Sequence, residues 1–338
     1  MKALVLHGPG QLDLRDIPEP VLKASEALLQ VRYVGLCGTD LNSFRGRNPL
    51  VSYPRIPGHE VSATILEVDN GAHDLAVGMQ VTLAPYTSCG KCASCLNQRY
   101  NACQFNQTLG VQRDGALTEY ISVPSNKLYT SAILGMKELC LVEPLTVGCH
   151  AVARARITAE DTVAIFGCGG VGLGAVAASA YRGARTIAID IDDAKLNVAK
   201  KAGAAHIINS KEQDHAAVLR DLTEGNGPQV VIEAVGHPQT FRQAVDLVAF
   251  TGRVVYIGYA KEPVLYETKL FVQKELDIMG ARNARPSDFK EVISMLERKI
   301  FPVNEAISAV VALDAVPDIL RAWDATPSRY TKIMIELS

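Results

Sequence analysis

Residues 164–174, AIFGCGGVGLG, join an apolar run to a glycine-rich turn and then to an alanine-rich segment. The glycines have the spacing G-x-G-x-x-G between a strand-like and a helix-like run, the context in which this spacing predicts a dinucleotide-binding turn. The first glycine permits a tight turn, the second lets backbone N–H groups approach a pyrophosphate at the helix N-terminus, and the third lets helix and strand pack closely. The candidate cradle is Gly167, Gly169, Gly170, Val171 and Gly172.

Asp190 supports this interpretation. It ends the next apolar run, TIAID, 18 residues beyond Gly172, close to the roughly 20 residues expected for a carboxylate that binds a ribose 2′-hydroxyl. A 2′-phosphate at this carboxylate would be repelled, so the sequence favours NAD over NADP. Without Asp190 and the flanking strands, the glycines could equally form an ordinary tight turn between a strand and a helix.

From residue 162 to residue 282, continuous apolar strands alternate with helix-like segments. This pattern predicts a parallel sheet covered by helices on both faces, the doubly wound α/β architecture. Two strand ends are candidates to line a nicotinamide pocket, because ligands bind at the carboxyl edge of such sheets; ordinary turns would explain them as well. These candidates are Ala234, Val235, Ile257 and Gly258.

Composition limits the possible partners and the compartment. A chain of 338 residues with 48% hydrophobic and 21% charged residues is long enough for two domains. The chain has 34 Lys and Arg residues and 36 Asp and Glu residues. It therefore has no excess of positive charge to attract nucleic acid. No run resembles a signal peptide or a membrane span. We expect a cytoplasmic protein that acts without nucleic acid or membrane.

Four of the eight cysteines lie in one short stretch, SCGKCASCLNQRYNAC. In a reducing compartment, clustered thiols more often hold a metal than form disulfides. Four thiolates make a closed tetrahedral zinc site, which leaves no position for a substrate and is therefore structural. An iron–sulfur cluster is an alternative, although the spacing differs from that of ferredoxins. The predicted ligands are Cys89, Cys92, Cys95 and Cys103.

A second candidate metal site is split between two turns, GLCGTD at 35–40 and PGHE at 57–60. Cys37 in the first and His59 in the second each precede apolar structure, and a catalytic zinc needs a few such ligands and one open position. Taken singly, the cysteine could be a small core residue and the histidine could be hydrogen-bonded to a carboxylate.

The ordered set of GLCGTD, PGHE, the four-cysteine segment, VEPL at 142–145 and GCGGVG at 167–172 resembles the zinc-containing medium-chain dehydrogenase/reductase superfamily. Glu60 and Glu143 make the chain most similar to the polyol and sugar-acid branch, which includes sorbitol dehydrogenase. The resemblance implies a mainly β, GroES-like catalytic domain at 1–146 and 283–338, and a Rossmann NAD-binding domain at 147–282. It also implies two zinc ions per chain and a homodimer or homotetramer.

The resemblance also implies roles for individual residues. Cys37 and His59 would ligate the catalytic zinc, with Glu60 and Glu143 as carboxylates of which either could touch the metal. Thr39 would bond the substrate oxygen and pass on its proton. Many relatives carry a histidine three residues after this hydroxyl, whereas this chain has Asn42, which does not titrate. The route of the proton is therefore open.

The expected reaction is reversible oxidation of a secondary alcohol by NAD. The segment MGARNARP, residues 279–286, resembles that of L-galactonate 5-dehydrogenase, and its Arg282 and Asn283 are candidates to bind substrate. Because a guanidinium binds a carboxylate through two hydrogen bonds, an aldonate such as L-galactonate or L-gulonate is expected. The arginines could instead hold two domains together, leaving a sorbitol- or threonine-type dehydrogenase. A protein of another class, a non-catalytic NAD- and zinc-binding module, would have no use for an open metal site.

Overall fold

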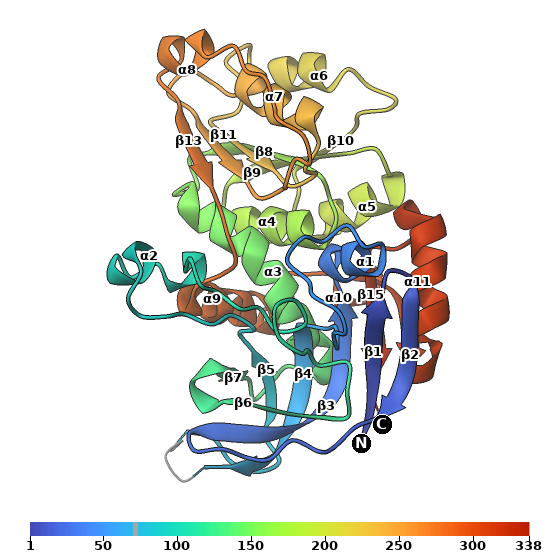
Figure 1. Ribbon diagram of the computed structural model, residues 1–338. Helices are drawn as coiled ribbons and strands as arrows, with labels where there is room; N and C mark the ends of the chain where they lie inside the picture. Colours follow the sequence, from blue (N-terminus) through green and yellow to red (C-terminus); the bar gives the residue numbers. More distant parts are fainter. Residues whose placement is uncertain (70–73, 338) are drawn as a thin grey trace. The chain divides into compact units, whose positions relative to one another are not determined.

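The computed structural model describes residues 1–69 and 74–337. The chain forms two compact units, Met1–Glu143 with Ala306–Ser338 and Pro144–Glu305 (Figure 1). The first unit is therefore interrupted in sequence by the second. Among the described residues, no helix is both long and apolar enough to cross a membrane.

The second unit is built on a six-stranded parallel sheet. Its order is β10-β9-β8-β11-β12-β13, which in chain order is 3-2-1-4-5-6, the order of the doubly wound dinucleotide-binding fold. Successive strands extend the sheet to one side of β8 as far as β10 and then to its other side from β11, so the strand order reverses between β8 and β11. Ligands bind at such a switch point. The strands are β8 (Thr162–Phe166), β9 (Arg185–Asp190), β10 (His206–Asn209), β11 (Val230–Glu233), β12 (Arg253–Tyr256) and β13 (Asp277–Gly280). The predicted architecture is confirmed.

Helices connect these strands. Asp192 and Asp214 start two of them by accepting backbone N–H groups of the first turn, which supplies the partners that a helix N-terminus lacks. Apolar residues of the central strands and helices form the core of this unit. The helices within this unit are α4 (Gly170–Tyr181), α5 (Asp193–Lys201), α6 (His215–Leu222), α7 (Pro238–Leu247), α8 (Lys269–Gln273) and α9 (Pro286–Glu297). Helices α3 (Met136–Arg154) and α10 (Val303–Ala306) each begin in one unit and end in the other.

The first unit is mainly β. A sheet runs in the order β14-β15-β3-β4-β5-β7, with β6 also paired to β3, and β1 pairs with β2. The 11-residue β3 lies at the centre, and its buried positions contribute to the apolar core of the unit. The strands are β1 (Lys2–Gly8), β2 (Gln11–Asp16), β3 (Glu26–Leu36), β4 (Glu60–Val68), β5 (Gln80–Leu83), β6 (Tyr120–Pro124), β7 (Leu128–Thr130), β14 (Ile307–Ala312) and β15 (Lys332–Glu336). Its helices include α1 (Gly38–Phe44), α2 (Ala93–Leu96) and α11 (Val316–Ala325).

The compact units and the expected domains divide the chain differently at residues 144–146 and 283–305. Both stretches were expected in the catalytic domain, but they lie in the second unit. For residues 283–305 the reason is the packing of α9: Asp288 pairs with His150 of α3 at 2.9 Å, and Glu291 pairs with Arg182 at 2.8 Å. Helix α3 also begins earlier than the expected connecting helix and includes Glu143.

Candidate metal and cofactor sites

Two neighbouring strands bring the first candidate metal ligands together. Cys37 follows the last residue of β3, while His59 and Glu60 stand at the start of β4. The strands are antiparallel, and Gly35 of β3 lies opposite Glu60, so the end of one meets the beginning of the other. One ligand atom from each of Cys37, His59 and Glu60 lies within 4.8 Å of the others. The spacing suits a single metal ion.

Asp40 is hydrogen-bonded to both turns that carry candidate metal ligands. Its Oδ2 accepts the backbone N–H of Cys37 at 2.8 Å, and its Oδ1 accepts that of Gly58 at 3.3 Å. The same Oδ1 lies 3.9 Å from Nδ1 of His59. At this distance the two groups attract each other electrostatically but share no hydrogen bond, and the buried Nδ1 of His59 has no hydrogen-bond partner among the described residues. Asp40 thus braces both turns through their backbone N–H groups.

Glu143 of α3 lies close enough to His59 and Glu60 to interact electrostatically with both. Its Oε1 accepts the hydroxyl of Tyr86, a buried residue that the sequence did not single out. Burial, together with the charge of Glu60, raises the pKa of the Glu143 carboxyl to about 7. Ionising a second buried carboxyl beside Cys37 and Glu60 costs free energy. A bound divalent cation would offset this cost. The donors therefore fit a zinc ion.

Lys332 is the second residue that sequence reasoning missed. Its Nζ lies 2.6 and 2.5 Å from the two oxygens of Glu60 and 3.2 Å from the carbonyl oxygen of Leu36. The pair bridges β15 and β4 across β3, and a Cβ on Gly35 would lie 2.1 Å from Oε2 of Glu60. Burial alone would lower the pKa of Lys332, but Glu60 and Cys37 raise it above its ordinary value. The lysine thus stays charged and positions Glu60.

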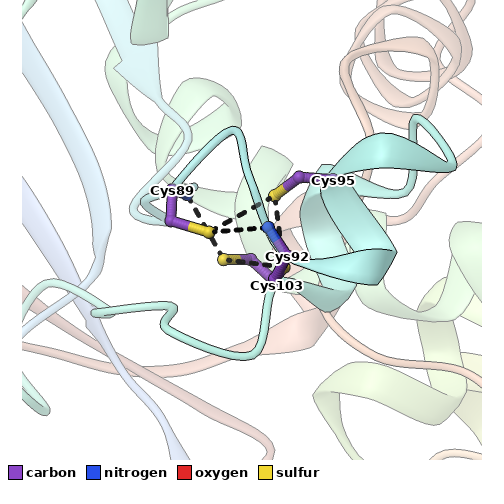
Figure 2. Close-up of side chains that lie close together, drawn as sticks. All are labelled: Cys89, Cys92, Cys95 and Cys103. Carbon is purple, nitrogen blue, oxygen red and sulfur yellow. Dashed lines mark hydrogen bonds between the residues drawn. The ribbon is translucent and has the colours of Figure 1, made fainter.

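The four predicted structural ligands form a separate cluster on the segment around α2 (Figure 2). Sulfur–sulfur distances are 4.0 Å for Cys89–Cys95, 3.6 Å for Cys92–Cys95 and 3.8 Å for Cys92–Cys103. Zinc–sulfur bonds of about 2.3 Å in a tetrahedron give edges of about 3.8 Å, whereas a disulfide needs about 2.05 Å. Backbone N–H groups of Gln104 and Cys95 lower the pKa of Cys92 to about 6. The geometry fits one zinc ion.

Cys92→Ser should remove this ion while leaving both apolar cores folded, because the cysteines form a cluster of their own. We expect bound zinc to fall from about two ions to about one per chain, protease to cleave within residues 87–107, and the unfolding free energy to fall, because binding of structural zinc contributes to folding. Plasma emission spectrometry and limited proteolysis measure these effects. Ser94→Ala, in the same short helix, is the control and should keep both ions. Full zinc content in Cys92→Ser would contradict the assignment.

The glycine-rich turn is built for a dinucleotide. Gly167 has φ +93°, and a Cβ on Gly172 would lie 1.8 Å from the carbonyl oxygen of Gly167, so a side chain cannot be accommodated there. A Cβ on Gly169 would meet nothing within 4 Å, which leaves its backbone open to a pyrophosphate at the start of α4. Gly170 and Val171 form the first turn of that helix.

Asp190 ends β9 beside this turn, as predicted. Its Oδ2 accepts the N–H of Cys168 at 2.6 Å, and its Oδ1 accepts those of Ile191 and Asp192 at 2.7 and 3.1 Å. The carboxylate thus holds the glycine-rich turn. Each oxygen has two lone pairs, so Oδ1 is filled by its two bonds and Oδ2 can still accept one ribose hydroxyl.

The remaining candidates lie in the second unit. Ala234 and Val235 follow β11, while Ile257 and Gly258 follow the adjacent β12, so the structure brings them to one sheet edge. Arg282 and Asn283 follow β13, half-buried, with Asn283 at φ +52°.

Comparisons with known proteins agree with this arrangement. Residues 23–132 match the family model described as an alcohol dehydrogenase GroES-like domain, and residues 170–298 match the zinc-binding dehydrogenase model. Sorbitol dehydrogenase of Bacillus subtilis is 35% identical over 99% of this chain and 97% of its own length. L-galactonate-5-dehydrogenase of Escherichia coli is 33% identical over 86% of each chain. An Escherichia coli alcohol dehydrogenase crystallised with NADH matches with a TM-score of 0.92 and 28% identity, covering 100% of this chain and 99% of its own.

The chain therefore belongs to the zinc-containing medium-chain alcohol dehydrogenase superfamily, with a GroES-like and a Rossmann-type domain. Within that superfamily it belongs to the polyol and sugar branch, and it is an enzyme that combines zinc with a nicotinamide dinucleotide.

Proposed function

We propose that the protein oxidises a secondary alcohol of a sugar acid or polyol, with NAD as the hydride acceptor and an aldonate such as L-galactonate or L-gulonate as the preferred substrate. The observation that carries the proposal is the donor set of half-buried Cys37 with buried His59 and Glu60, in a chain that also has a dinucleotide turn. Zinc held by Cys37, His59 and either Glu60 or Glu143 would polarise the substrate hydroxyl, and NAD would accept the hydride.

The chain's own residues would position the alcohol and move its proton. The Thr39 hydroxyl lies 3.6 Å from the Cys37 sulfur, a position from which it can accept the proton of an alcohol oxygen held beside that sulfur. Asn42, on the same helix, cannot relay a proton by titrating. We therefore propose that the proton leaves Thr39 through water. Asp40 keeps the Cys37 and His59 turns in place during this step.

The cofactor preference is testable. NAD should give a kcat/KM at least about a hundredfold higher than NADP, because Asp190 accepts a ribose hydroxyl and repels a 2′-phosphate. Asp190→Ala should lower the ratio of kcat/KM for NAD to kcat/KM for NADP, mainly by weakening the binding of NAD. The substitution removes an acceptor and also leaves the Cys168 N–H of the turn without its partner. Initial rates with both cofactors measure the effect. Asp192→Ala, which removes the adjacent helix cap, is the control; equal kcat/KM values for wild-type protein with NAD and NADP would contradict the prediction.

Three considerations support an aldonate as substrate. The segment 279–286 resembles that of L-galactonate 5-dehydrogenase, a relative bearing this name is 33% identical, and Arg282 can bind a carboxylate through two hydrogen bonds. Sorbitol is the main alternative, since the Bacillus subtilis relative is named for it.

A panel of aldonates, polyols and amino-alcohols, followed by NADH absorbance, tests the substrate. We expect L-galactonate or L-gulonate to be oxidised with the highest kcat/KM, and Arg282→Ala to raise the KM for that aldonate about tenfold, the usual effect of losing a charged hydrogen bond. Its KM for sorbitol should change less than twofold. Arg298→Ala, another arginine of the same unit, is the control. If sorbitol or threonine gave the highest kcat/KM, the preference for an aldonate would be wrong. Only the broader polyol-dehydrogenase function would then be supported.

We also propose a cytoplasmic homodimer or homotetramer. All eight cysteines are free, as in proteins of reducing compartments. Strand β13 ends the order of the parallel sheet, and its Ile278 is 39% exposed, a feature of edges at which a further strand can pair. Light scattering gives the mass in solution, and a monomer would contradict the proposal.

A further inference from the structure

Glu233 is a buried carboxylate that neither metal site uses. It is the last residue of β11, and its side chain is 0% exposed. In the parallel register it lies between Phe166 of β8 and Tyr256 of β12. Glu233 therefore occupies the carboxyl edge at the centre of the sheet, where the turns that follow all three strands begin.

The carboxylate fastens the turn of its own strand. Its Oε1 accepts the backbone N–H groups of Val235 at 2.9 Å and Gly236 at 2.8 Å, and the hydroxyl of Thr240 at 2.8 Å. Gly236 has φ +81°, a conformation that is strained for other residues. A single oxygen thus fixes the path of residues 234–237.

The same residue also fastens the turn of the next strand. Its carbonyl oxygen accepts the N–H groups of Ile257 at 2.9 Å and Gly258 at 3.2 Å. A Cβ on Gly258 would lie 2.4 Å from the nitrogen of Gly236 and 2.5 Å from Oε2 of Glu233. The two turns therefore touch each other and the carboxylate, with no space for a side chain between them.

Ala234 and Val235 also lie close to the dinucleotide turn at Gly167. A Cβ on Gly167 would lie 2.9 Å from Val235 and 3.2 Å from the carbonyl group of Ala234. A displacement of residues 234–235 would thus reach the glycine-rich turn directly. Glu233 is hydrogen-bonded to the turn at 234–237 and also to the turn at 257–258.

The second carboxylate oxygen of Glu233 lowers the stability of the folded protein. Oε2 is buried and has no hydrogen-bond partner among the described residues, and burial raises the pKa of the carboxyl above its ordinary value. An unsatisfied buried polar atom lowers stability, so folding alone gives little reason for a glutamate here.

We propose that Glu233 is a positioning residue for the cofactor: it holds the turns at 234–237 and 257–259 in contact with each other and with the dinucleotide turn. The proposal rests on the proposed use of a nicotinamide cofactor. Glu233 acts through these backbone turns and is not itself a catalytic residue.

The test measures the affinity of the zinc-loaded protein for NADH by fluorescence titration. It also measures the midpoint of thermal unfolding. Glu233→Gln keeps an acceptor oxygen and the size of the side chain but removes the charge that strengthens three hydrogen bonds. We expect the Kd for NADH to rise about tenfold, with the KM for NAD raised more than kcat is lowered. Thr240→Val, which removes one of the three donors to Oε1, should give a smaller rise in the same direction.

Asp161→Asn is the matched control. Asp161 is another buried carboxylate of this unit, hydrogen-bonded to Thr158 and Arg253, but it precedes β8 at the opposite edge of the sheet. This variant should lower the thermal midpoint and leave the Kd for NADH within twofold of wild type. An unchanged Kd in Glu233→Gln, or an equal rise in Asp161→Asn, would overturn the proposal. Absence of NADH binding by the wild-type protein would instead overturn the proposed function, and this inference with it.

Discussion

Cys37→Ser should reduce turnover at least about a thousandfold while leaving the protein folded. A serine hydroxyl is a poor replacement for a thiolate ligand of zinc, and Lewis-acid stabilisation contributes several kcal/mol to such reactions. The residue lies in the turn between β3 and α1 and belongs to neither apolar core, so removing its sulfur leaves the packing of both units intact. His59→Ala should give the same result.

Three measurements separate loss of metal from loss of fold. Zinc content should fall from about two ions to about one per chain, circular dichroism should stay unchanged, and NADH should still bind to the second unit. Cys149→Ser, a buried cysteine of α3 outside both metal clusters, is the control and should keep both ions. Intact turnover in Cys37→Ser would rule out a metal held by Cys37 as part of the reaction and favour a reductase that works without zinc.

Lys332→Met should be the most destabilising of the substitutions considered. The lysine is 6% exposed and pairs with both oxygens of Glu60, itself 1% exposed. Removing one partner leaves an uncompensated buried charge, which costs about 3–5 kcal/mol. The shift of the urea unfolding midpoint measures this cost, and zinc content shows whether Glu60 then turns toward the metal pocket.

The double variant Lys332→Met with Glu60→Gln separates charge from packing. Because it removes both charges, it should recover a substantial part of the lost stability, as replacement of whole buried ion pairs often does. Lys269→Met, whose partner Glu267 is exposed, is the control and should leave the urea midpoint close to that of the wild-type protein, because exposed ion pairs contribute little. A wild-type midpoint in Lys332→Met would contradict the structural role given to the pair.

The parts of the structure that follow from short sequence patterns were predictable. The glycine spacing with Asp190 predicted the dinucleotide turn, and the cysteine spacing predicted a cluster whose sulfur atoms lie 3.6 to 4.0 Å apart. Both patterns are local, because their chemistry needs ligands or N–H groups from one continuous segment. Cys37 and His59 needed the resemblance to a family as well, since only the pairing of β3 with β4 brings them together.

The supporting residues could not be predicted, because their partners are distant or unusual. Lys332 lies 272 residues from Glu60, in a strand whose pattern, KIMIE, predicts nothing about a buried lysine, and lysine is almost never fully buried unless paired. Tyr86 and Glu233 likewise depend on contacts made only after folding. The boundary at 283–305 depends on the packing of α9, which composition does not reveal.

The interrupted first unit has a consequence for the order in which a nascent chain can fold. Strand β15 pairs with the central β3, yet the ribosome makes all of Pro144–Glu305 between them. The inserted unit is continuous and can fold as soon as it emerges, whereas the unit around Cys37 must wait. Until Lys332 is translated, Glu60 lacks the counter-charge that it has in the folded protein, so the candidate metal site is completed after the inserted unit.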